Sequence, residues 1–402
     1  MNPIYKAYCR AYQTVFRGAA YLIPWREPEL ITGAGTVKTL PSIIKAKGIN
    51  NVLIVTDKGI TKLGLYNSLV ENLEKTGIKY SIYDGTQPNP TINNVNEAKA
   101  MYINNRCEAK IAFGGGSPMD CAKLCGAAVV RPKKPIQKMR GLFKVMRKLP
   151  PLFAIPTTAG TGSETTIVAV VTDSETHEKY PVNDPQLRPR YAVLDPELTV
   201  SLPPSITAAT GMDVLTHAVE AYIGRSNTKS TKEAAEKAAK LVFENLYEVY
   251  SNGQNLEARE NMLVASYFAG IAFTRAYVGY VHAIAHNIGG LYNVPHGLAN
   301  AIIMPYVLEA YGKYAYKSLA KLADLTGAAG DAATEEEKAK NFIEAIKEMN
   351  RKMEIPDKIA ELKEEDIDTI AKRALKEANP LYPVPKLMDR KEIAEVIRRL
   401  LP

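Results

Sequence analysis

Three of the five histidines in this chain of 402 residues lie close together, in the segment GYVHAIAHNIGGLYNVPHGLAN (279–300). His282 and His286 are four residues apart, a spacing that places two side chains on one face of a helix. His296 follows ten residues later, after a Gly-Gly pair and a Val-Pro pair. We expect the chain to turn at Gly289-Gly290 and at the Val-Pro pair, which would bring His296 back toward the other two. Such imidazoles are either hydrogen-bonded structural groups or metal ligands.

A second segment, GMDVLTHAVEAY (211–222), carries a carboxylate and an imidazole at the same spacing, so a helix would present Asp213 and His217 on one face. Carboxylate and imidazole together suit Fe²⁺ or Zn²⁺. A single histidine is more often a hydrogen-bonded structural residue. Burying four imidazoles without a shared purpose would be costly, however. The joint pattern therefore predicts a metal site.

Long helical segments must position these side chains. Beyond about residue 200 the sequence has helical periodicity in stretches such as TGMDVLTHAVEAYIG, TKEAAEKAAKLVFENLYEVYS and ARENMLVASYFAGIAFTRAYV. Before it, strand-like runs alternate with helical segments: NVLIVTD (51–57), KYSIYD (79–84), EAKIAFGGGS (108–117) and PLFAIPTT (151–158). That alternation predicts a parallel sheet with helices on both faces. We expect an α/β domain over residues 1–200 and an all-helical domain over residues 201–402, with the boundary at about 195–205.

A glycine cluster follows one of these strands, in IAFGGGSPMDCAK (111–123). Glycine has no Cβ, so the backbone can pass close to a pyrophosphate, and the helix that follows offers free N–H groups. We expect Ser117 to be the N-cap of that helix and Asp120 to lie in its first turn. A tight strand–helix turn also uses glycine, so the cluster by itself indicates phosphate binding without establishing it.

A second loop, IPTTAGTGSETT (155–166), places hydroxyl groups and glycines after the next strand. Thr157, Thr158 and Thr161 are candidates to line a nucleotide site, although an irregular loop held by side-chain hydrogen bonds would look similar. Two such loops at successive strand ends favour a ligand, because open α/β sheets bind ligands at the carboxyl ends of their strands.

Asp57 ends the first clear strand. An acid at that position can accept hydrogen bonds from an adenosine ribose and repels a 2′-phosphate, which favours NAD over NADP. By contrast, GAGTVKTL (33–40) lacks the third glycine and the strong preceding strand of a dinucleotide-binding fingerprint. We interpret it as the entry to a helix.

Composition and charge bear on the remaining functions. The net charge of +8 owes much to RPKKPIQKMRGLFKVMRKLP (131–150), which has eight Lys or Arg residues and no acid. Without aromatic interleaving or a nucleic-acid-binding motif, we interpret it as a solvated connector, and we expect no nucleic-acid or membrane partner. His177, in a polar segment, is expected to be solvated. Four irregularly spaced cysteines indicate free thiols in a reducing compartment. With no signal peptide visible and the longest apolar run (262–273) too short to span a bilayer, we expect a cytoplasmic protein.

Five segments resemble the signature segments of the iron-containing (group III) alcohol dehydrogenases: GGGSPMDCAK, PTTAGTGSETT, LDPELT, GMDVLTHAVEAY and VHAIAHNIGGLYNVPHGLANAIIMP. Their order and spacing agree with that family from about residue 30 to the C-terminus. The resemblance implies the dehydroquinate synthase-like fold, a Rossmann-like α/β nucleotide-binding domain followed by an all-helical metal-binding domain. We also expect a homodimer or a higher homo-oligomer. The N-terminal thirty residues and the basic stretch 131–150 depart from the family pattern.

Residue roles follow from the same resemblance. The family's metal ligands fall on Asp213, His217, His282 and His296. His286 then resembles the family's histidine near the nicotinamide and not on the metal. The cofactor positions fall on ten residues: Asp57, Asn89, Gly115, Gly116, Ser117, Asp120, Thr157, Thr158, Thr161 and Lys179. The family favours Fe²⁺, with Zn²⁺ equally compatible by ligand type, and NAD as the cofactor.

These expectations combine into a metal-dependent, NAD-linked alcohol dehydrogenase or aldehyde reductase for a small primary alcohol, diol or aldehyde, with His286 as the proton relay. Two alternatives keep the fold: a glycerol-type polyol dehydrogenase and a dehydroquinate-synthase-like lyase. A metallohydrolase would leave the two glycine loops without a purpose. A nucleic-acid-binding or scaffold protein would rest on the basic stretch alone. The sequence does not name the substrate.

Overall fold

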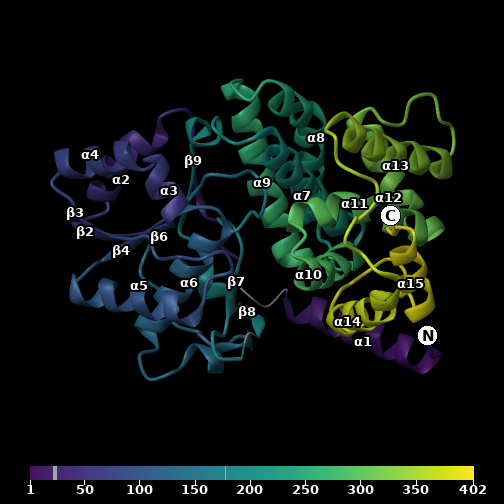
Figure 1. Ribbon diagram of the computed structural model, residues 1–402, viewed down its shortest axis with the longest axis horizontal. Helices are drawn as coiled ribbons and strands as arrows, with labels where there is room; N and C mark the ends of the chain where they lie inside the picture. The colour runs from purple at the N-terminus through teal and green to yellow at the C-terminus, as the bar shows by residue number, and fades with distance from the viewer. Residues whose placement is uncertain (21–24, 177) are drawn as a thin grey trace. The chain divides into compact units, whose positions relative to one another are not determined.

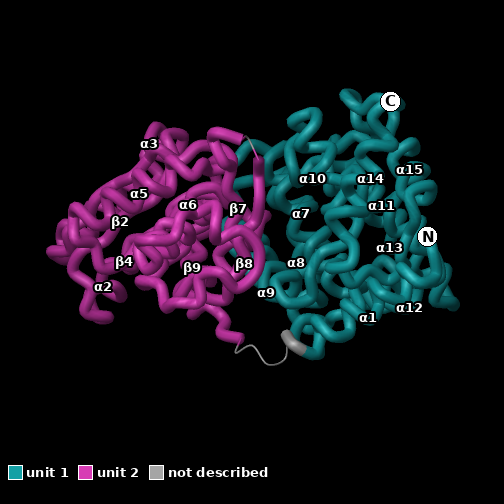
Figure 2. Tube along the Cα trace, turned by 90° about the horizontal axis from the view of Figure 1, so that it is seen from below, with its two compact units in different colours: residues 1–24, 202–402 teal, residues 25–201 magenta. Residues whose placement is uncertain are grey.

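The computed structural model describes residues 1–20, 25–176 and 178–402 (Figure 1). His177, expected to be solvated, lies outside the described residues. The chain forms two compact units: an α/β unit, Trp25–Ser201, and a helical unit made of Met1–Pro24 and Leu202–Pro402 (Figure 2). The junction between the two units lies at residues 201–202. Residues 1–20, however, belong to the helical unit and not to the α/β domain assigned to 1–200.

A sheet of six parallel strands forms the centre of the α/β unit, in the order β1-β9-β6-β4-β2-β3. The strands are β1 (Glu29–Thr32), β2 (Asn51–Val55), β3 (Lys79–Tyr83), β4 (Ala109–Gly114), β6 (Leu152–Pro156) and β9 (Tyr191–Leu194). The strands predicted from the apolar runs are confirmed as β2, β3, β4 and β6. Strands β4, β6 and β9 are buried along their whole length, as expected for parallel strands covered on both faces.

Helices cover both faces of this sheet. They are α2 (Thr36–Ala46), α3 (Lys58–Leu63), α4 (Asn67–Lys75), α5 (Ile92–Asn104) and α6 (Gly116–Val130). Alternate residues of β2 contribute to two different cores, Val52 and Ile54 to one and Leu53 and Val55 to the other, because successive side chains of a strand point to opposite faces. The predicted α/β fold with a parallel sheet is confirmed.

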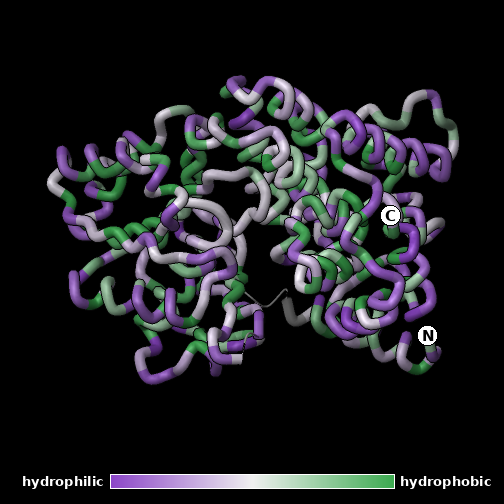
Figure 3. The backbone as a smooth tube through the Cα atoms, in the orientation of Figure 1, coloured by the Kyte–Doolittle hydropathy of each residue, from purple (hydrophilic) through white to green (hydrophobic). Residues whose placement is uncertain are grey.

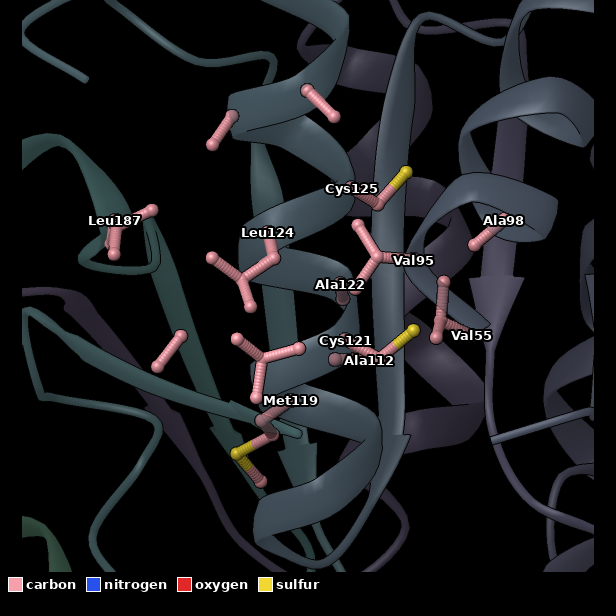
Figure 4. Close-up of a cluster of buried hydrophobic side chains, with 14 of the residues drawn as sticks. Val55, Val95, Ala98, Ala112, Met119, Cys121, Ala122, Leu124, Cys125 and Leu187 are labelled. Atoms are coloured by element: carbon pink, nitrogen blue, oxygen red, sulfur yellow. The ribbon is translucent and has the colours of Figure 1, made fainter. Parts of the chain in front are cut away.

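Helix α6 is buried on several sides, and most of its residues are apolar; Asp120 and Lys123 are its two charged residues. Figure 4 shows Cys121 and Cys125 on the side of α6 that faces Ala98 of α5, with Leu124 on the side toward Leu187. All four cysteines lie in the described part of the chain as free, buried thiols.

A small sheet was not predicted from the sequence. It has the order β5-β8-β7, from β5 (Gly141–Leu142), β7 (Val168–Thr172) and β8 (Lys179–Asn183). The basic stretch 131–150 joins α6 to β6, as a connector should, but part of it is built into this sheet. Arg131 donates from Nε to the carbonyl of Val145, and Asp184 accepts from the backbone N–H groups of Val145 and Met146.

The helical unit confirms the predicted all-helical domain. Its helices are α1 (Pro3–Ala20), α7 (Pro204–Ile223), α8 (Lys229–Ser251), α9 (Leu256–Ala276), α10 (Tyr280–Tyr292), α11 (His296–Tyr311), α12 (Tyr316–Thr326), α13 (Glu335–Lys352), α14 (Ile367–Ala378) and α15 (Arg390–Arg398). Most positions along α13 are hydrophilic, with hydrophobic ones at intervals (Figure 3), and its buried stripe includes Phe342 and Ile346. Within the described residues, no single helix is long and apolar enough to cross a bilayer. Helices α9 and α10 pass that test only together, bent by 103°.

Hydrogen bonds attach α1 to the helical unit, which is why the expected domain 1–200 differs from the structural unit at its start. Arg10 donates to the carbonyls of Val384 and Pro385, and the buried Gln13 amide donates to those of Pro380 and Tyr382. In the α/β unit, GAGTVKTL is a helix entry as predicted, since α2 begins directly after Gly35.

Candidate metal centre and cofactor loops

Four side chains of the helical unit converge. Asp213 and His217 come from α7, His282 from α10 and His296 from α11. One ligand atom of each lies within 4.8 Å of those of the other three. Nε2 of His296 lies 3.5 Å from Oδ1 of Asp213, and Nε2 of His282 lies 3.9 Å from the same oxygen. All but His296 are buried. This Asp–His group has the four members that the family resemblance implied.

The turn that presents His296 differs from the expected one. Helix α10 runs through Gly289-Gly290 and ends at Tyr292, and its C-cap, Asn293, is left-handed with a φ of 57°. The predicted turn at the two glycines is therefore wrong, because the helical sequence around them outweighs the roughly 1 kcal/mol that a glycine costs in a helix interior. The predicted turn at Val294-Pro295 is confirmed, and α11 begins at the next residue, His296.

A glycine lets α11 approach α7 closely. A Cβ on Gly297 would lie 2.3 Å from the carbonyl oxygen of Ala209 and 3.4 Å from Cβ of Asp213. Any side chain at this position would push the two helices apart. The residue after His296 thus decides whether that imidazole reaches the Asp213 carboxylate.

The Asp–His group fits a divalent cation. Nε2 of His282 and Nδ1 of His217 are buried without a hydrogen-bond partner among the described residues. Burial and the neighbouring imidazoles hold the pKa of His282 well below its usual range, and burial lowers the pKa of His217. Both rings are therefore neutral, the form that binds metals. One carboxylate with three imidazoles suits Fe²⁺ or Zn²⁺.

Glu220 fixes the orientation of His282 and was missed from the sequence. Its carboxylate accepts from Nδ1 of His282 at 2.7 Å and from the backbone N–H groups of Gly279 and Val281 at 2.8 Å each. The proton on Nδ1 leaves Nε2 as the free lone pair, an arrangement typical of metal-binding histidines. Burial raises the pKa of Glu220 to about 7, and its N–H donors oppose that shift. The sequence signal was its place three residues after His217, on the same helix.

Asn300 holds the carboxylate of the group. Its Nδ2 donates to Oδ1 of Asp213 at 2.7 Å and lies 3.2 Å from Nε2 of His296. His217 is held by stacking, with its ring centroid 4.1 Å from that of Phe273 and 4.5 Å from that of His282.

His286 lies beside the Asp–His group and is not one of its four members. Its ring centroid is 5.2 Å from that of His296 and 5.9 Å from that of His282. Nδ1 of His286 faces Oε1 of Glu377 at 2.6 Å. This side chain is 43% exposed, unlike the buried His282.

In the α/β unit, the glycine cluster forms the tight turn between the end of β4 and the start of α6. Gly114 has a φ of 142°, and a Cβ there would lie 2.8 Å from Cγ of Pro118, so only glycine suits the position. Gly115 is the N-cap of α6, and the prediction of Ser117 as the cap is wrong. The Ser117 hydroxyl instead accepts from the backbone N–H of Asn89 at 3.2 Å.

The other predicted cofactor residues gather at the same edge of the sheet. Asp57 follows β2 and accepts from the N–H of Ile60 at the start of α3, while its second oxygen would lie 3.6 Å from a Cβ on Gly114. Asn89 lies beyond β3, and Nζ of Lys179 donates to its side-chain oxygen at 2.5 Å. The predicted cofactor residues thus follow the carboxyl ends of the neighbouring strands β6, β4, β2 and β3. Open α/β sheets bind their ligands at this edge.

The hydroxyl loop after β6 lies against the glycine cluster. A Cβ on Gly115 would be 3.7 Å from Oγ1 of Thr158, and one on Gly116 would be 3.3 Å from Cγ2 of Thr161. Thr157 is buried and donates its backbone N–H to the carbonyl of Gly114. The structure therefore brings all three threonines and the glycines together within one unit.

Asp120, predicted as a cofactor residue, makes hydrogen bonds within the α/β unit. It lies just past the first turn of α6, and its two oxygens accept from the Ser163 hydroxyl at 3.1 Å and from the N–H of Val170 at 3.0 Å. Burial raises its pKa, and Lys123 acts against that shift. Both oxygens thus tie α6 to the hydroxyl loop and to β7.

Lys123 also connects α6 to the hydroxyl loop, and it was not predicted from the sequence. Its buried Nζ donates to Ser163, Thr166 and the carbonyl of Val168, each at 2.8 Å. Burial lowers the pKa of Lys123 to about 8. The three acceptors satisfy every N–H of an ammonium group, so this cation anchors the hydroxyl loop.

Two family models together match nearly the whole chain. Residues 28–196 match the model described as iron-containing alcohol dehydrogenase, and residues 207–401 match the C-terminal model of the Fe-containing alcohol dehydrogenase family. The chain belongs to the iron-containing alcohol dehydrogenase family. It is accordingly an alcohol oxidoreductase, as the resemblance implied, and this favours oxidoreduction over the lyase and hydrolase alternatives.

Relatives of this family are similar over most of their length. The 1,3-propanediol dehydrogenase of Klebsiella pneumoniae is 37% identical over 91% of this chain and 95% of its own. The NAD-dependent methanol dehydrogenase of Bacillus methanolicus is 36% identical over 93% and 98%. The crystal structure of a 1,3-propanediol oxidoreductase superposes with a TM-score of 0.90 at 36% identity, covering 94% of this chain and 99% of that one.

Proposed function

We propose that this chain catalyses reversible hydride transfer between NAD and a small primary alcohol, diol or aldehyde, with an iron ion held by the Asp–His group. The observation that carries the proposal is the group itself: four ligand atoms within 4.8 Å of one another, in a member of an iron-containing family. Zinc suits the same ligands.

The relatives support the substrate class and the cofactor. Their names specify 1,3-propanediol, methanol and lactaldehyde, all small molecules with an alcohol or aldehyde group. A sulfoacetaldehyde reductase from Bifidobacterium kashiwanohense, 28% identical, was solved with NAD⁺. The glycerol-type polyol alternative would use the same chemistry as oxidation of a diol, the substrate in the name of one relative.

The residues of the helical unit divide into those that would hold the metal and one that moves a proton. Asp213, His217, His282 and His296 would hold a divalent cation. When bound, that cation would supply polarisation of an alcohol or carbonyl oxygen, and a nicotinamide would supply the hydride chemistry. Glu220 keeps Nε2 of His282 unprotonated, and Asn300 fixes the Asp213 carboxylate. His286 lies beside this group and is the residue we assign to proton transfer.

The residues of the α/β unit would hold NAD. We assign the backbone at Gly115 and Gly116 and the Ser117 hydroxyl to binding the pyrophosphate, because these three residues stand at the N-terminus of α6. Asp57 would accept from the adenosine ribose and repel NADP. The remaining assignments to the cofactor are Asn89, Thr157, Thr158, Thr161 and Lys179. Asp120 we assign to positioning the hydroxyl loop, because both of its oxygens bind other residues of the chain.

We also propose that the protein works in the cytoplasm as a homodimer or a higher homo-oligomer. Four free, buried cysteines suit a reducing compartment. Sedimentation of the purified protein would measure its oligomeric state.

A substrate panel tests the proposed function. The protein is reconstituted with Fe²⁺ or with Zn²⁺, and NADH consumption is followed over a series of small aldehydes. We expect turnover with at least one of them, and with NADH in preference to NADPH. A reconstituted protein that turns over none of the aldehydes would contradict the proposal.

A further inference from the structure

His286 belongs to a hydrogen-bonded set of three side chains in the helical unit. Its Nδ1 lies 2.6 Å from Oε1 of Glu377, on the last turn of α14, and the hydroxyl of Tyr382 donates to the same oxygen at 3.1 Å. Burial and the Glu377 carboxylate raise the pKa of Tyr382 well above its ordinary value, so the phenol remains a donor.

These contacts determine which nitrogen of His286 is available for chemistry. An ionised carboxylate only accepts, so the nitrogen that faces Glu377 must carry the hydrogen. In the neutral ring the other nitrogen, Nε2, is then the acceptor. A proton relay needs such a defined acceptor and a fixed ring, and His286 is too exposed, at 43%, for packing alone to hold it.

The N-terminal helix braces the segment that carries Tyr382. The Gln13 amide, 5% exposed, donates to the carbonyls of Pro380 and Tyr382 at 3.1 and 2.8 Å. Arg10 donates to the two carbonyls at residues 384 and 385. Helix α1 lies before both matched family ranges, which begin at residues 28 and 207. A segment outside the family match therefore supports the residue that anchors Glu377.

We infer that Glu377 is a positioning residue for His286, and that α1 supports it through Gln13 and Tyr382. This inference rests on the proposed function, because it gives His286 a role in proton transfer. The opposing view is an ordinary surface pair, which contributes little and whose loss leaves turnover unchanged.

A double-mutant cycle separates the two views. Wild type, His286→Ala, Glu377→Ala and the double variant are compared for kcat, KM, bound iron and NADH affinity. We expect Glu377→Ala to lower kcat about 10- to 100-fold, as for other residues that orient a functional histidine, with bound iron and NADH affinity unchanged. In the His286→Ala background the same change should cost less than about twofold. An unchanged kcat in Glu377→Ala, or an equal loss in both backgrounds, would overturn the inference.

The conservative variant Glu377→Gln supplies a rescue test. Its amide oxygen can still accept from Nδ1 of His286 and from Tyr382. We therefore expect its kcat to lie much nearer the wild type than that of Glu377→Ala. A Gln variant as slow as the Ala variant would contradict positioning by this hydrogen bond.

A spectroscopic readout keeps this inference distinct from the proposed function. In Zn²⁺-loaded protein labelled with ¹⁵N-histidine, His286 should show a protonated Nδ1 in the wild type and a mixture of tautomers in Glu377→Ala. If no aldehyde is reduced but this signature is present, the proposed function fails and the positioning of His286 stands. A wild-type His286 protonated on Nε2 would overturn the inference whatever the activity.

The contribution of α1 is tested with neighbouring residues. Gln13→Ala removes both amide hydrogen bonds to the 380–382 segment, whereas Thr14→Ala changes an exposed neighbour on the same helix. We expect a several-fold lower kcat for Gln13→Ala with normal bound iron, and wild-type kcat for Thr14→Ala. Equal kcat in the two variants would remove α1 from the inference.

Discussion

The Asp–His group and the cofactor loops are built by different means. In the helical unit, side chains supply the chemistry: imidazoles and a carboxylate are held by α7, α10 and α11 and oriented by buried Glu220 and Asn300. In the α/β unit, backbone and small residues at strand ends form the loops, and buried Lys123 and partly buried Asp120 hold them in place. Changes in the first region should therefore abolish metal binding, and changes in the second should alter cofactor affinity and choice.

The largest expected effect comes from removing a metal ligand. His282→Ala deletes a buried imidazole of the Asp–His group, so bound iron should fall to a small fraction of the wild type. Aldehyde reduction should fall by at least about three orders of magnitude, the scale of losing a central catalytic group. Metal analysis and the NADH assay measure both. NADH affinity should be unchanged, since the cofactor loops belong to the other unit; a protein that keeps its iron would refute the assignment of His282.

Glu220→Gln should have a smaller effect on the same region. An amide oxygen in the place of Oε2 can still accept from Nδ1 of His282 and from the N–H of Gly279, but the amide nitrogen then faces the N–H of Val281, and the side chain lacks the charge that supports the ligand. We expect iron affinity to fall about 10- to 100-fold, measured by competition with a chelator. Wild-type iron affinity in this variant would show that Glu220 has only a structural role.

Asp57→Ser tests the cofactor side of the comparison. Losing an acceptor with full charge costs about 1.5–3 kcal/mol, so the KM for NADH should rise about tenfold or more, with bound iron unchanged. NADPH should become a better substrate, because the repulsion of its 2′-phosphate is gone. Kinetics with both cofactors provide the measurement. An unaltered preference for NADH would move cofactor selection to another residue.

The smallest expected effect concerns the helix that carries His282 and His286. Gly290 lies inside α10, and a Cβ there would meet nothing within 4 Å among the described residues. Gly290→Ala should therefore stabilise the protein by about 0.5–1 kcal/mol, seen as a higher Tm with kcat unchanged. Gly289→Ala is the matched comparison, because its Cβ would lie 3.2 Å from the carbonyl oxygen of Val294. A lower Tm for Gly290→Ala would indicate a turn at the glycines after all.

The sequence predicted the elements whose signal is local. Strands β2, β3, β4 and β6 are short apolar runs bounded by polar residues, and the long helices after residue 200 keep a regular period. In the small sheet, β5 has only two residues and β8 contains a lysine and a proline, so neither has a clear local signal. Its third strand, β7, does have an apolar β-branched run and was overlooked.

In the candidate site, too, the residues that were missed are those whose contacts join distant parts of the sequence. The four members of the Asp–His group were found through motif spacing and family resemblance. Glu220, Lys123 and Glu377 were missed because their partners are 62, 40 and 91 residues away along the chain. The cap on α6 was assigned to Ser117 from residue type, whereas its hydroxyl is used by Asn89 after a neighbouring strand. The hydrogen bonds between α1 and residues 380–385 could not be predicted either, because the partners lie at opposite ends of the sequence.

X-ray absorption at the iron edge tests the central claim most directly. In the wild type reconstituted with Fe²⁺, the Asp–His group predicts imidazole nitrogens and a carboxylate oxygen as the protein ligands and no sulfur, and it predicts that the iron signal is lost in His282→Ala. Sulfur ligation, or the same iron environment in wild type and His282→Ala, would place the metal elsewhere and contradict the account.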